Sequence, residues 1–379
     1  MDPKIDPFPG WQGIVEHPLG ALSEAFGALL SRGFLDVSAL WRQFYADTAT
    51  DYLRWYSLLI YAAGCGVAYL VLARRGQEKA SPRHMLAYLL PREIWSSRSF
   101  RIDIQFHIAT LLRLPQLLRF GGILLVAAAV TRLGALHLDH LPGLATISAA
   151  LARLPLEWRL LVQFLLAFIA FDFGFYWGHR LLHRSKILWQ FHRVHHYSRQ
   201  LNMLAGIRHH PVDPLVTDTL GYLAAALVLC LFFDDGGRPG EPSTGAPYWL
   251  AFAVTALDLI LSRFTHSHVT FSLGRRLDRI LVTPAVHAVH HSRDIPDVNF
   301  GNSLSLWDAL FGTFHAKDAT VPVRLGIAEF DDGHYRNFVH AVVEPFRDAF
   351  VLLIGAVPIR TPPAGSTATP PSSARRRSS

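Results

Sequence analysis

Five apolar segments, each close to the length of a helix that crosses a bilayer, constrain this chain most. They cover residues 56–72, 120–136, 160–177, 215–233 and 248–264. A bilayer core requires about 20 mostly apolar residues in helical form. Charged residues make up only 17% of the chain, whereas a soluble domain usually carries about 25%. The sequence therefore predicts an all-α integral membrane bundle of about four to five spans.

Lys and Arg residues flank the apolar segments and indicate their orientation. Loops near the ends of spans are richest in Lys and Arg on the cytoplasmic side. Segments 74–118 and 178–213 are basic, whereas segment 234–247 has one Arg against three acidic residues. Alternation of the spans then places 74–118, 178–213 and the chain after residue 265 on the cytoplasmic side. The net charge of +7 is thus read as a topology signal, and nucleic acid is not expected as a partner.

Histidine is the most unusual residue type in this chain, with 20 copies among 379 residues. Many of them fall into HxxxH and HxxHH patterns, and by chance one HxxHH pattern is expected only about 0.06 times in a chain of this composition. Residues at i, i+3 and i+4 share one face of a helix, so these spacings direct imidazoles to one point. The clustered residues are His179 and His183; His192, His195 and His196; His266 and His268; and His287, His290 and His291.

All of these clusters lie on the same predicted side of the membrane, so they can converge on a shared metal centre in a helical cap. Cys65 and Cys230 stand alone in apolar segments, which argues against a thiolate site. Imidazole suits zinc, copper, iron and nickel. Eight or nine histidines exceed the needs of one metal, so two metals with about four ligands each and an open position are expected.

The identity of the metals decides the class of reaction. Zinc has no redox chemistry, whereas iron or copper can support oxidation. A site beside apolar spans suits an unactivated hydrocarbon, which favours iron and a lipid substrate. A zinc-dependent membrane hydrolase, a non-enzymatic membrane metal carrier and a bis-histidine haem protein are the alternatives. A carrier would need ligands near the bilayer midplane, and haem ligands would lie within the spans.

At these residues the chain resembles the fatty acid hydroxylase and sterol desaturase superfamily, whose members carry an HxxxH box followed by two HxxHH boxes. The resemblance covers about residues 160–314. It includes the D-x3-Y-x2-HR pattern from Asp172 to Arg180 and a closing segment from Asp297 to Thr313. It implies a membrane-bound, O2-dependent, non-haem di-iron oxidoreductase that hydroxylates or desaturates a lipid alkyl chain.

The resemblance also implies the ligands of two iron ions. It assigns eight box histidines and adds His266 as a ninth, with His268 as a possible further ligand. Bracing residues around the ligands are expected as well, with Asp172 either orienting an imidazole or pairing with Arg180. The box ligands are His179, His183, His192, His195, His196, His287, His290 and His291, and the bracing residues are Asp172, Tyr176, His210, Asn299 and Asp308.

Other histidines are expected to be structural or to face solvent. They are His107, His137, His140, His209, His315, His334 and His340. The sequence contains no Gly-rich dinucleotide motif and no CxxC or haem-attachment motif. Electrons are therefore expected from a separate reductase or electron carrier, and the resemblance implies O2 as co-substrate.

Four regions follow from these patterns. Residues 1–110 contain the first span and a basic loop, and no secretory signal is visible at their start. Residues 111–316 form the catalytic membrane domain and 317–360 a helical or interfacial segment. Residues 361–379, rich in Pro, Ser and Arg, are expected to be disordered.

Overall fold

The computed structural model describes residues 55–76, 78–79, 81–112, 121–122, 125–126, 129, 142–232, 248–317, 323–330 and 333–355. Within these residues the regular elements are helices, and the only strand-like pairing is an isolated bridge between Ser292 and Leu325. The predicted all-α class is confirmed for this part of the chain. Residues 1–54 and the tail 361–379 lie outside the described residues.

The helices follow one another in this order: α4 Trp55–Arg74, α5 Pro82–Leu89, α6 Arg92–Trp95, α7 Arg98–Leu111, α9 Pro142–Ala152, α10 Leu156–Arg184, α11 Lys186–His196, η2 Ala205–Ile207, α12 Val212–Phe232, α13 Tyr248–Thr265, η3 Leu277–Arg279, α14 Pro284–His290, α15 Leu306–Leu310 and α16 Phe338–Leu353.

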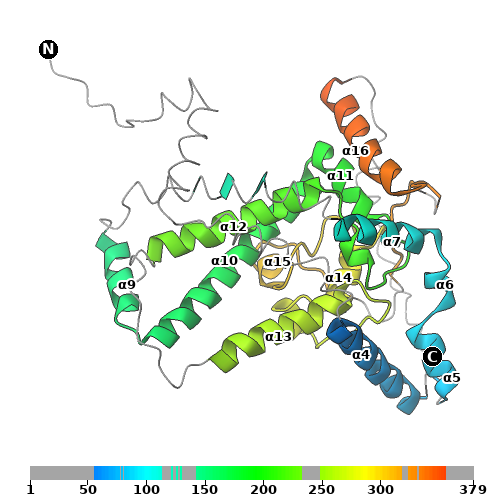
Figure 1. Ribbon diagram of the computed structural model, residues 1–379, viewed down its shortest axis with the longest axis horizontal. Helices are drawn as coiled ribbons and strands as arrows, with labels where there is room; N and C mark the ends of the chain where they lie inside the picture. Colours follow the sequence, from blue (N-terminus) through cyan, green and yellow to red (C-terminus); the bar gives the residue numbers. More distant parts are fainter. Residues whose placement is uncertain are drawn as a thin grey trace, which may run out of the picture.

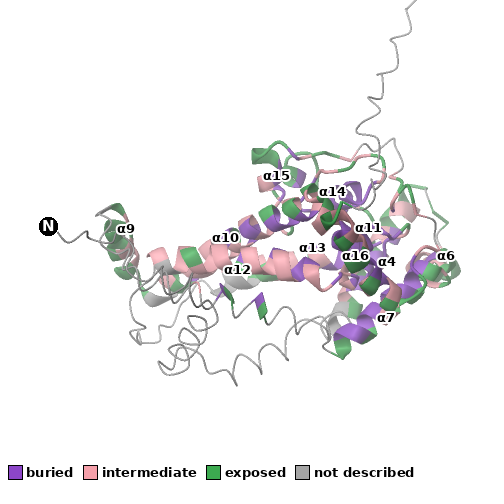
Figure 2. Cartoon of the chain, turned by 90° about the horizontal axis from the view of Figure 1, so that it is seen from above, coloured by how far each residue is buried: buried purple, intermediate pink, exposed green. Residues whose placement is uncertain are grey.

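The long helices α10, α12 and α13 lie together along the long axis of the molecule, and the shorter helices α7, α11, α14 and α16 gather at one end (Figures 1 and 2). Two described helices are long and apolar enough to cross a membrane, over Trp158–Arg184 and Val212–Leu229. Only 22% of each window is buried within the molecule. A core helix of a soluble protein would be mostly buried, so the exposed apolar sides favour a membrane setting.

The other predicted spans have different outcomes. Segment 248–264 forms most of α13, and segment 56–72 forms most of α4. However, α4 contacts the histidine end of α13, where Tyr61 stacks on Phe264 at 5.4 Å between ring centroids. Segment 120–136 lies mostly outside the described residues. The count of four to five spans remains a prediction.

Glycines allow α10 and α12 to approach closely. A Cβ added at Gly174 would overlap the carbonyl group of Leu220 and lie 2.8 Å from the Cα of Gly221. One turn later, a Cβ at Gly178 would lie 2.9 Å from the Cα of Thr217. Small residues four apart are a common device for close helix packing in membranes. This packing sets the position of His179, which directly follows Gly178.

Helix caps set the start of each HxxHH helix. The Ser185 side chain accepts a hydrogen bond from the Leu188 amide, which ends α10 and starts α11 between His183 and His192. Thr283 accepts from the Val286 amide and precedes a proline at the first position of α14. Such caps satisfy amide groups that have no partner within the helix.

Candidate metal centre

Nine imidazoles from four separate segments meet at the end of the long helices, in two adjacent groups. Within each group the possible ligand nitrogens all lie within 4.8 Å of one another. The two groups are neighbours, since the rings of His196 and His291 stack at 4.5 Å between centroids. Group one contains His179, His183, His192, His196 and His290, and group two contains His195, His266, His287 and His291.

Each HxxHH box divides its residues between the two groups. In α11, the i and i+4 pair His192 and His196 belongs to group one, and His195 belongs to group two. At α14 the assignment is reversed, because His287 and His291 belong to group two and His290 to group one. Although all three positions lie on one side of a helix, i and i+4 are only about 40° apart around its axis, whereas i+3 and i+4 are about 100° apart. The two helices therefore bridge both groups.

Several imidazoles use one ring nitrogen, the outer one, to donate a hydrogen bond to an oxygen outside the cluster. Their other ring nitrogen then faces a neighbouring imidazole with an unprotonated lone pair. His179 Nδ1 donates to the Phe300 carbonyl at 2.8 Å, and His192 Nδ1 donates to the Asp213 carboxylate at 3.1 Å. Because these oxygens only accept, each Nδ1 carries a proton, and in the corresponding neutral tautomer Nε2 carries none. These two Nε2 atoms lie 3.0 Å apart.

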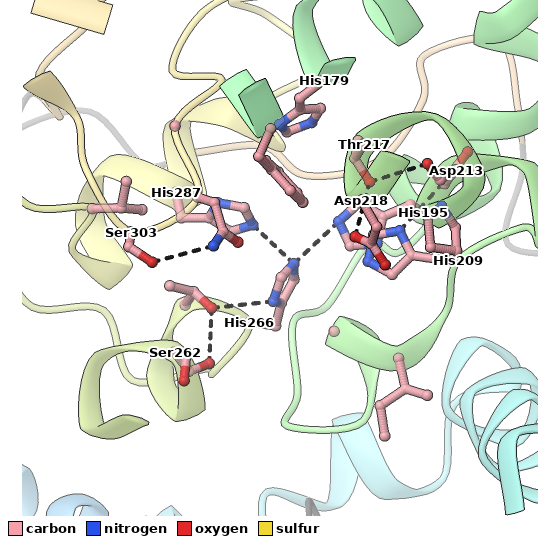
Figure 3. A pocket seen from close by; sticks show the side chains of 18 of the residues that line it. His179, His195, His209, Asp213, Thr217, Asp218, Ser262, His266, His287 and Ser303 are labelled. Carbon is pink, nitrogen blue, oxygen red and sulfur yellow. Dashed lines mark hydrogen bonds and ion pairs between the residues drawn. The ribbon is translucent and has the colours of Figure 1, made fainter. Parts of the chain in front are cut away.

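The same pattern occurs in group two. His195 Nδ1 donates to the Arg208 carbonyl at 3.3 Å, and its Nε2 lies 3.1 Å from His266 Nε2. His266 Nε2 lies 2.8 Å from His287 Nε2. Figure 3 shows His266 between His195 and His287, joined to both.

Burial favours the neutral form of six of these rings. It lowers the pKa of His290 to about 3, and burial together with neighbouring imidazoles holds the pKa values of five others well below their usual range. These five are His195, His196, His266, His287 and His291. Neutral rings whose lone pairs face one another without a proton repel, whereas a cation between them satisfies both. The all-imidazole donor sets, one of five rings and one of four, thus fit two transition-metal ions.

Asp308 and Asn299 brace this site through the segment that follows the last box. Asp308 accepts from the amides of Phe300 at 2.7 Å and Gly301 at 2.8 Å, next to the carbonyl that holds His179. The Asn299 side chain donates to the carbonyls of Val286 and His315, and its φ of 56° lies in the left-handed region. Both residues act on ligand positions through the backbone.

Asp172 takes neither of the two roles named for it, whereas Tyr176 packs against Phe300 in the segment that braces the ligands. Asp172 accepts from the amides of Ser303 at 2.8 Å and Leu304 at 3.1 Å and from the Trp307 indole at 3.0 Å. It therefore anchors a loop, rather than orienting an imidazole or pairing with Arg180. Tyr176 joins Thr313 at 3.0 Å and accepts from Arg180.

The roles expected of His210 and His268 are not seen, because neither residue contacts the ligands of the two metal-binding groups. His210 Nε2 donates to the Val342 carbonyl and its Nδ1 accepts from the Val212 amide, so it ties α12 to α16 instead of bracing a ligand. His268 belongs to neither group among the described residues, because its nitrogens meet the Tyr61 hydroxyl at 3.1 Å and the Tyr88 carbonyl at 2.9 Å.

The remaining histidines also have defined surroundings. His209, expected to face solvent, is half-buried and stacks on His195 at 4.0 Å between centroids. His107 is buried in α7, and His334 and His340 contact Glu344. His137 and His140 lie outside the described residues.

Sequence reasoning missed the acidic and basic residues that hold the outer nitrogens. Asp213 Oδ2 contacts both His192 and His209. Arg208, whose carbonyl holds His195, is fully buried and forms an ion pair with Asp103 at 3.3 Å. Asp213 could have been found from the sequence, because it lies four residues after His209, at the start of α12. Asp103 lies 105 residues before Arg208, and nothing in the sequence indicated that the two would pair.

A cavity of about 410 Å³ adjoins both groups. Its lining includes His179, His192, His195, His266 and His287, together with residues of α7, α10, η2, α12 and α13 and of the loop that contains Ser303. Several of its lining residues are drawn in Figure 3. The site therefore combines two metal-binding groups with space for a substrate.

Comparison with known proteins matches a family model described as fatty acid hydroxylase over residues 164–313. Ornithine lipid hydroxylase OlsE of Rhizobium tropici is 29% identical over 51% of this chain and 53% of its own length. Human alkylglycerol monooxygenase is 34% identical over 41% of this chain and 31% of its own. A rice very-long-chain aldehyde decarbonylase, GL1-9, is 26% identical over 40% and 54%.

The chain thus matches about half or less of the length of these relatives. No solved structure matches the chain. The family model spans α10 to α15, the elements that carry all nine imidazoles, and the named relatives are lipid-modifying enzymes. Residues 164–313 therefore form a domain that is similar to the fatty acid hydroxylase family.

Proposed function

We propose that this protein is a membrane-bound, O2-dependent oxidoreductase that hydroxylates a lipid alkyl chain. The observation that carries the proposal is the set of nine imidazoles in two adjacent groups beside a cavity. Two iron ions held there would supply the oxygen chemistry that an unactivated C–H bond requires. The printed names of the relatives, a lipid hydroxylase and a monooxygenase, support hydroxylation rather than desaturation.

The overall reaction balances as follows: one C–H bond and one O2, with two electrons and two protons, give one C–O–H group and one water. The chain shows no motif for a redox cofactor besides the histidines, so the electrons come from a separate reductase or electron carrier. The chain itself contributes ligand nitrogens in fixed tautomers, buried surroundings and a cavity for the substrate.

The setting of the site is also part of the proposal. α10, α12 and α13 would cross the membrane, and the histidine groups would lie in a cap on the cytoplasmic side, within a catalytic domain of residues 111–316. The loop charges and the single location of all nine imidazoles support this arrangement.

Lipid extracts from cells that produce the full chain, compared by mass spectrometry with extracts from a His290→Ala variant, test the proposal. The expected result is one or more hydroxylated lipids, 16 Da heavier than their precursors by one oxygen atom, that are lost in His290→Ala. A His84→Ala variant serves as control, because His84 is exposed in α5. Identical oxidised lipids in all three strains would contradict the proposal.

A further inference from the structure

The helix α7 precedes residues 164–313, which match the family model, yet it contacts the chain beside the metal-binding groups. Its buried residue Asp103 is 0% exposed and meets the connection between α11 and α12 at two points. The Asn202 side-chain amide donates to Asp103 Oδ2 at 2.8 Å, and Arg208 Nε lies 3.3 Å from Oδ1. One carboxylate of α7 therefore holds both ends of the segment 202–208.

The side chain of Arg208 is enclosed between α7 and the residue that follows the second box. Its Nη1 atom donates to the Ser99 hydroxyl at 3.0 Å, and its guanidinium carbon lies 5.6 Å from the centroid of the Tyr197 ring. Both Arg208 and its ion-pair partner Asp103 are fully buried. A buried ion pair adds little net stability, because the loss of hydration offsets the attraction. What this pair does determine is the position of Arg208.

The backbone at Arg208 forms a tight turn that presents its carbonyl group to His195. Its φ of −74° and ψ of 73° are those of an inverse γ-turn. The His209 amide donates to the Ile207 carbonyl at 2.8 Å, as such a turn requires. The Arg208 carbonyl oxygen then lies 3.3 Å from His195 Nδ1. The turn therefore sets the direction of the acceptor that keeps a proton on Nδ1 of His195.

The same segment also packs against a second imidazole of group two. Gly206 of η2 lies so close to His266 that a Cβ added there would be 2.9 Å from the Nδ1 atom of that ring. The Nε2 atoms of His266 and His195 lie 3.1 Å apart. Two of the four imidazoles of group two therefore depend on a segment that Asp103 holds in place.

The imidazoles of group one are held by other parts of the chain. His179 and His290 donate from Nδ1 to backbone carbonyls in the loop after α14, and His192 donates to Asp213 of α12. These acceptors lie outside the segment 202–208. A change in the position of that segment should therefore affect group two before it affects group one.

We propose that Asp103 is a positioning residue for the metal ion of group two, acting through Arg208 and the segment 202–208. It keeps the Arg208 carbonyl where it accepts the Nδ1 proton of His195, so that Nε2 of His195 stays free for the ion. This inference rests on the proposed function, because it concerns the same metal centre, but it holds whether the ions are iron or zinc. It gives α7, which lies before the matched domain, a role in that centre.

The test counts metal ions in the full chain by inductively coupled plasma mass spectrometry, after equilibration with a chelator of known affinity. Asp103→Asn removes the negative charge at nearly constant shape. Ile102→Ala is the control for lost stability, because Ile102 is 2% exposed in the same helix. Asp294→Asn, in an exposed ion pair with Arg324, is the control for loss of a carboxylate. Thermal unfolding compares the stability of these variants.

Asp103→Asn should weaken the binding of one of the two ions by about 10-fold to 100-fold, the usual effect of losing a partner that supports a ligand. Mössbauer spectra of the iron-loaded chain should then lose one of two iron signals. The two control variants should keep both ions. Equal weakening of both ions in Asp103→Asn, or the same selective loss in Ile102→Ala at similar stability, would overturn the inference.

Double variants identify the group that is affected. Asp103→Asn combined with His266→Ala, both directed at group two, should still bind one ion, whereas Asp103→Asn combined with His183→Ala should bind none. The reverse pattern would overturn the inference. Ser99→Ala removes only the hydrogen bond to Arg208 and should weaken the same ion to a smaller extent, so it serves as the test if Asp103→Asn does not fold.

The same measurements separate this inference from the proposed function. Two zinc ions in the wild type, with one lost selectively in Asp103→Asn, would uphold the positioning role and contradict the proposed reaction. Two iron ions that Asp103→Asn retains as firmly as the wild type, in a chain that oxidises lipid, would uphold the reaction and overturn the positioning role.

Discussion

The hydrogen bond at Nδ1 of an imidazole determines whether its Nε2 atom is free to bind a metal ion. Carbonyl or carboxylate acceptors hold His179, His192, His195 and His290 in the tautomer that leaves Nε2 free. Among these acceptors only Asp213 is a side chain, so its effect can be removed by substitution without disturbing the backbone.

Asp213→Asn should weaken metal binding, because the amide no longer offers a negatively charged acceptor to His192. Loss of such a partner typically costs about 10-fold to 100-fold in metal affinity. The measurement is metal retained during competition with a chelator of known affinity. Asp294→Asn is the matched control, and unchanged retention in Asp213→Asn would show that Asp213 does not support His192.

Acid should destabilise the metal-free protein. A histidine of the unfolded chain has a pKa near 6.5, whereas burial lowers the folded pKa of His290 to about 3. Between these values the unfolded state binds more protons, so the free energy of unfolding falls as pH decreases from about 6.5 towards 3. Thermal unfolding at a series of pH values measures this effect, and stability that is constant or rises with acid would contradict it.

The chemistry of the nine imidazoles was predictable, but their surroundings were not. The spacing within each box predicted which residues converge, because i and i+4 positions share a face whatever the rest of the fold does. Asp213 and Arg208 meet the imidazoles only through the path of the chain between α11 and α12. His268 lies only two residues after His266 in the sequence, yet its nitrogens contact Tyr61 and Tyr88.

At the scale of helices, close contact between α10 and α12 positions the first box. Gly174→Ala should destabilise the fold by about 1 to 3 kcal/mol, because the new methyl group would meet the backbone at Leu220 and Gly221. The measurement is thermal unfolding in detergent.

Gly66→Ala in α4 is the matched control for this substitution. A Cβ at Gly66 has open space around it, and alanine is the better helix former. Equal effects of the two substitutions would mean that close packing at Gly174 is not needed.

Helix positions were predicted more accurately than their ends. Segment 160–177 lies inside α10, which continues to Arg184 because its last turns, although polar, contain good helix formers and are covered by the histidine cap. Segment 215–233 corresponds to α12, which starts at Val212 and therefore includes Asp213. A prediction based only on the length of an apolar segment misses the polar turns at the helix ends. The site is built from residues in these turns.

At the scale of the whole molecule, the sequence predicted one shared face for all the histidine clusters, and the structure brings the nine imidazoles together at one end of the long helices. The division of each HxxHH box between two groups was not predictable, since it depends on how α11 and α14 face each other. The side of the membrane on which this end lies remains a prediction from loop charge.

The central claim is that these imidazoles hold two redox-active ions. The most direct test is elemental analysis of the full chain purified under conditions that keep bound metals, by inductively coupled plasma mass spectrometry. The account predicts two iron ions per chain in the wild type and a loss of metal in His266→Ala and His183→Ala, with His268→Ala unchanged. Two zinc ions per chain, or no bound metal in a folded protein, would contradict it.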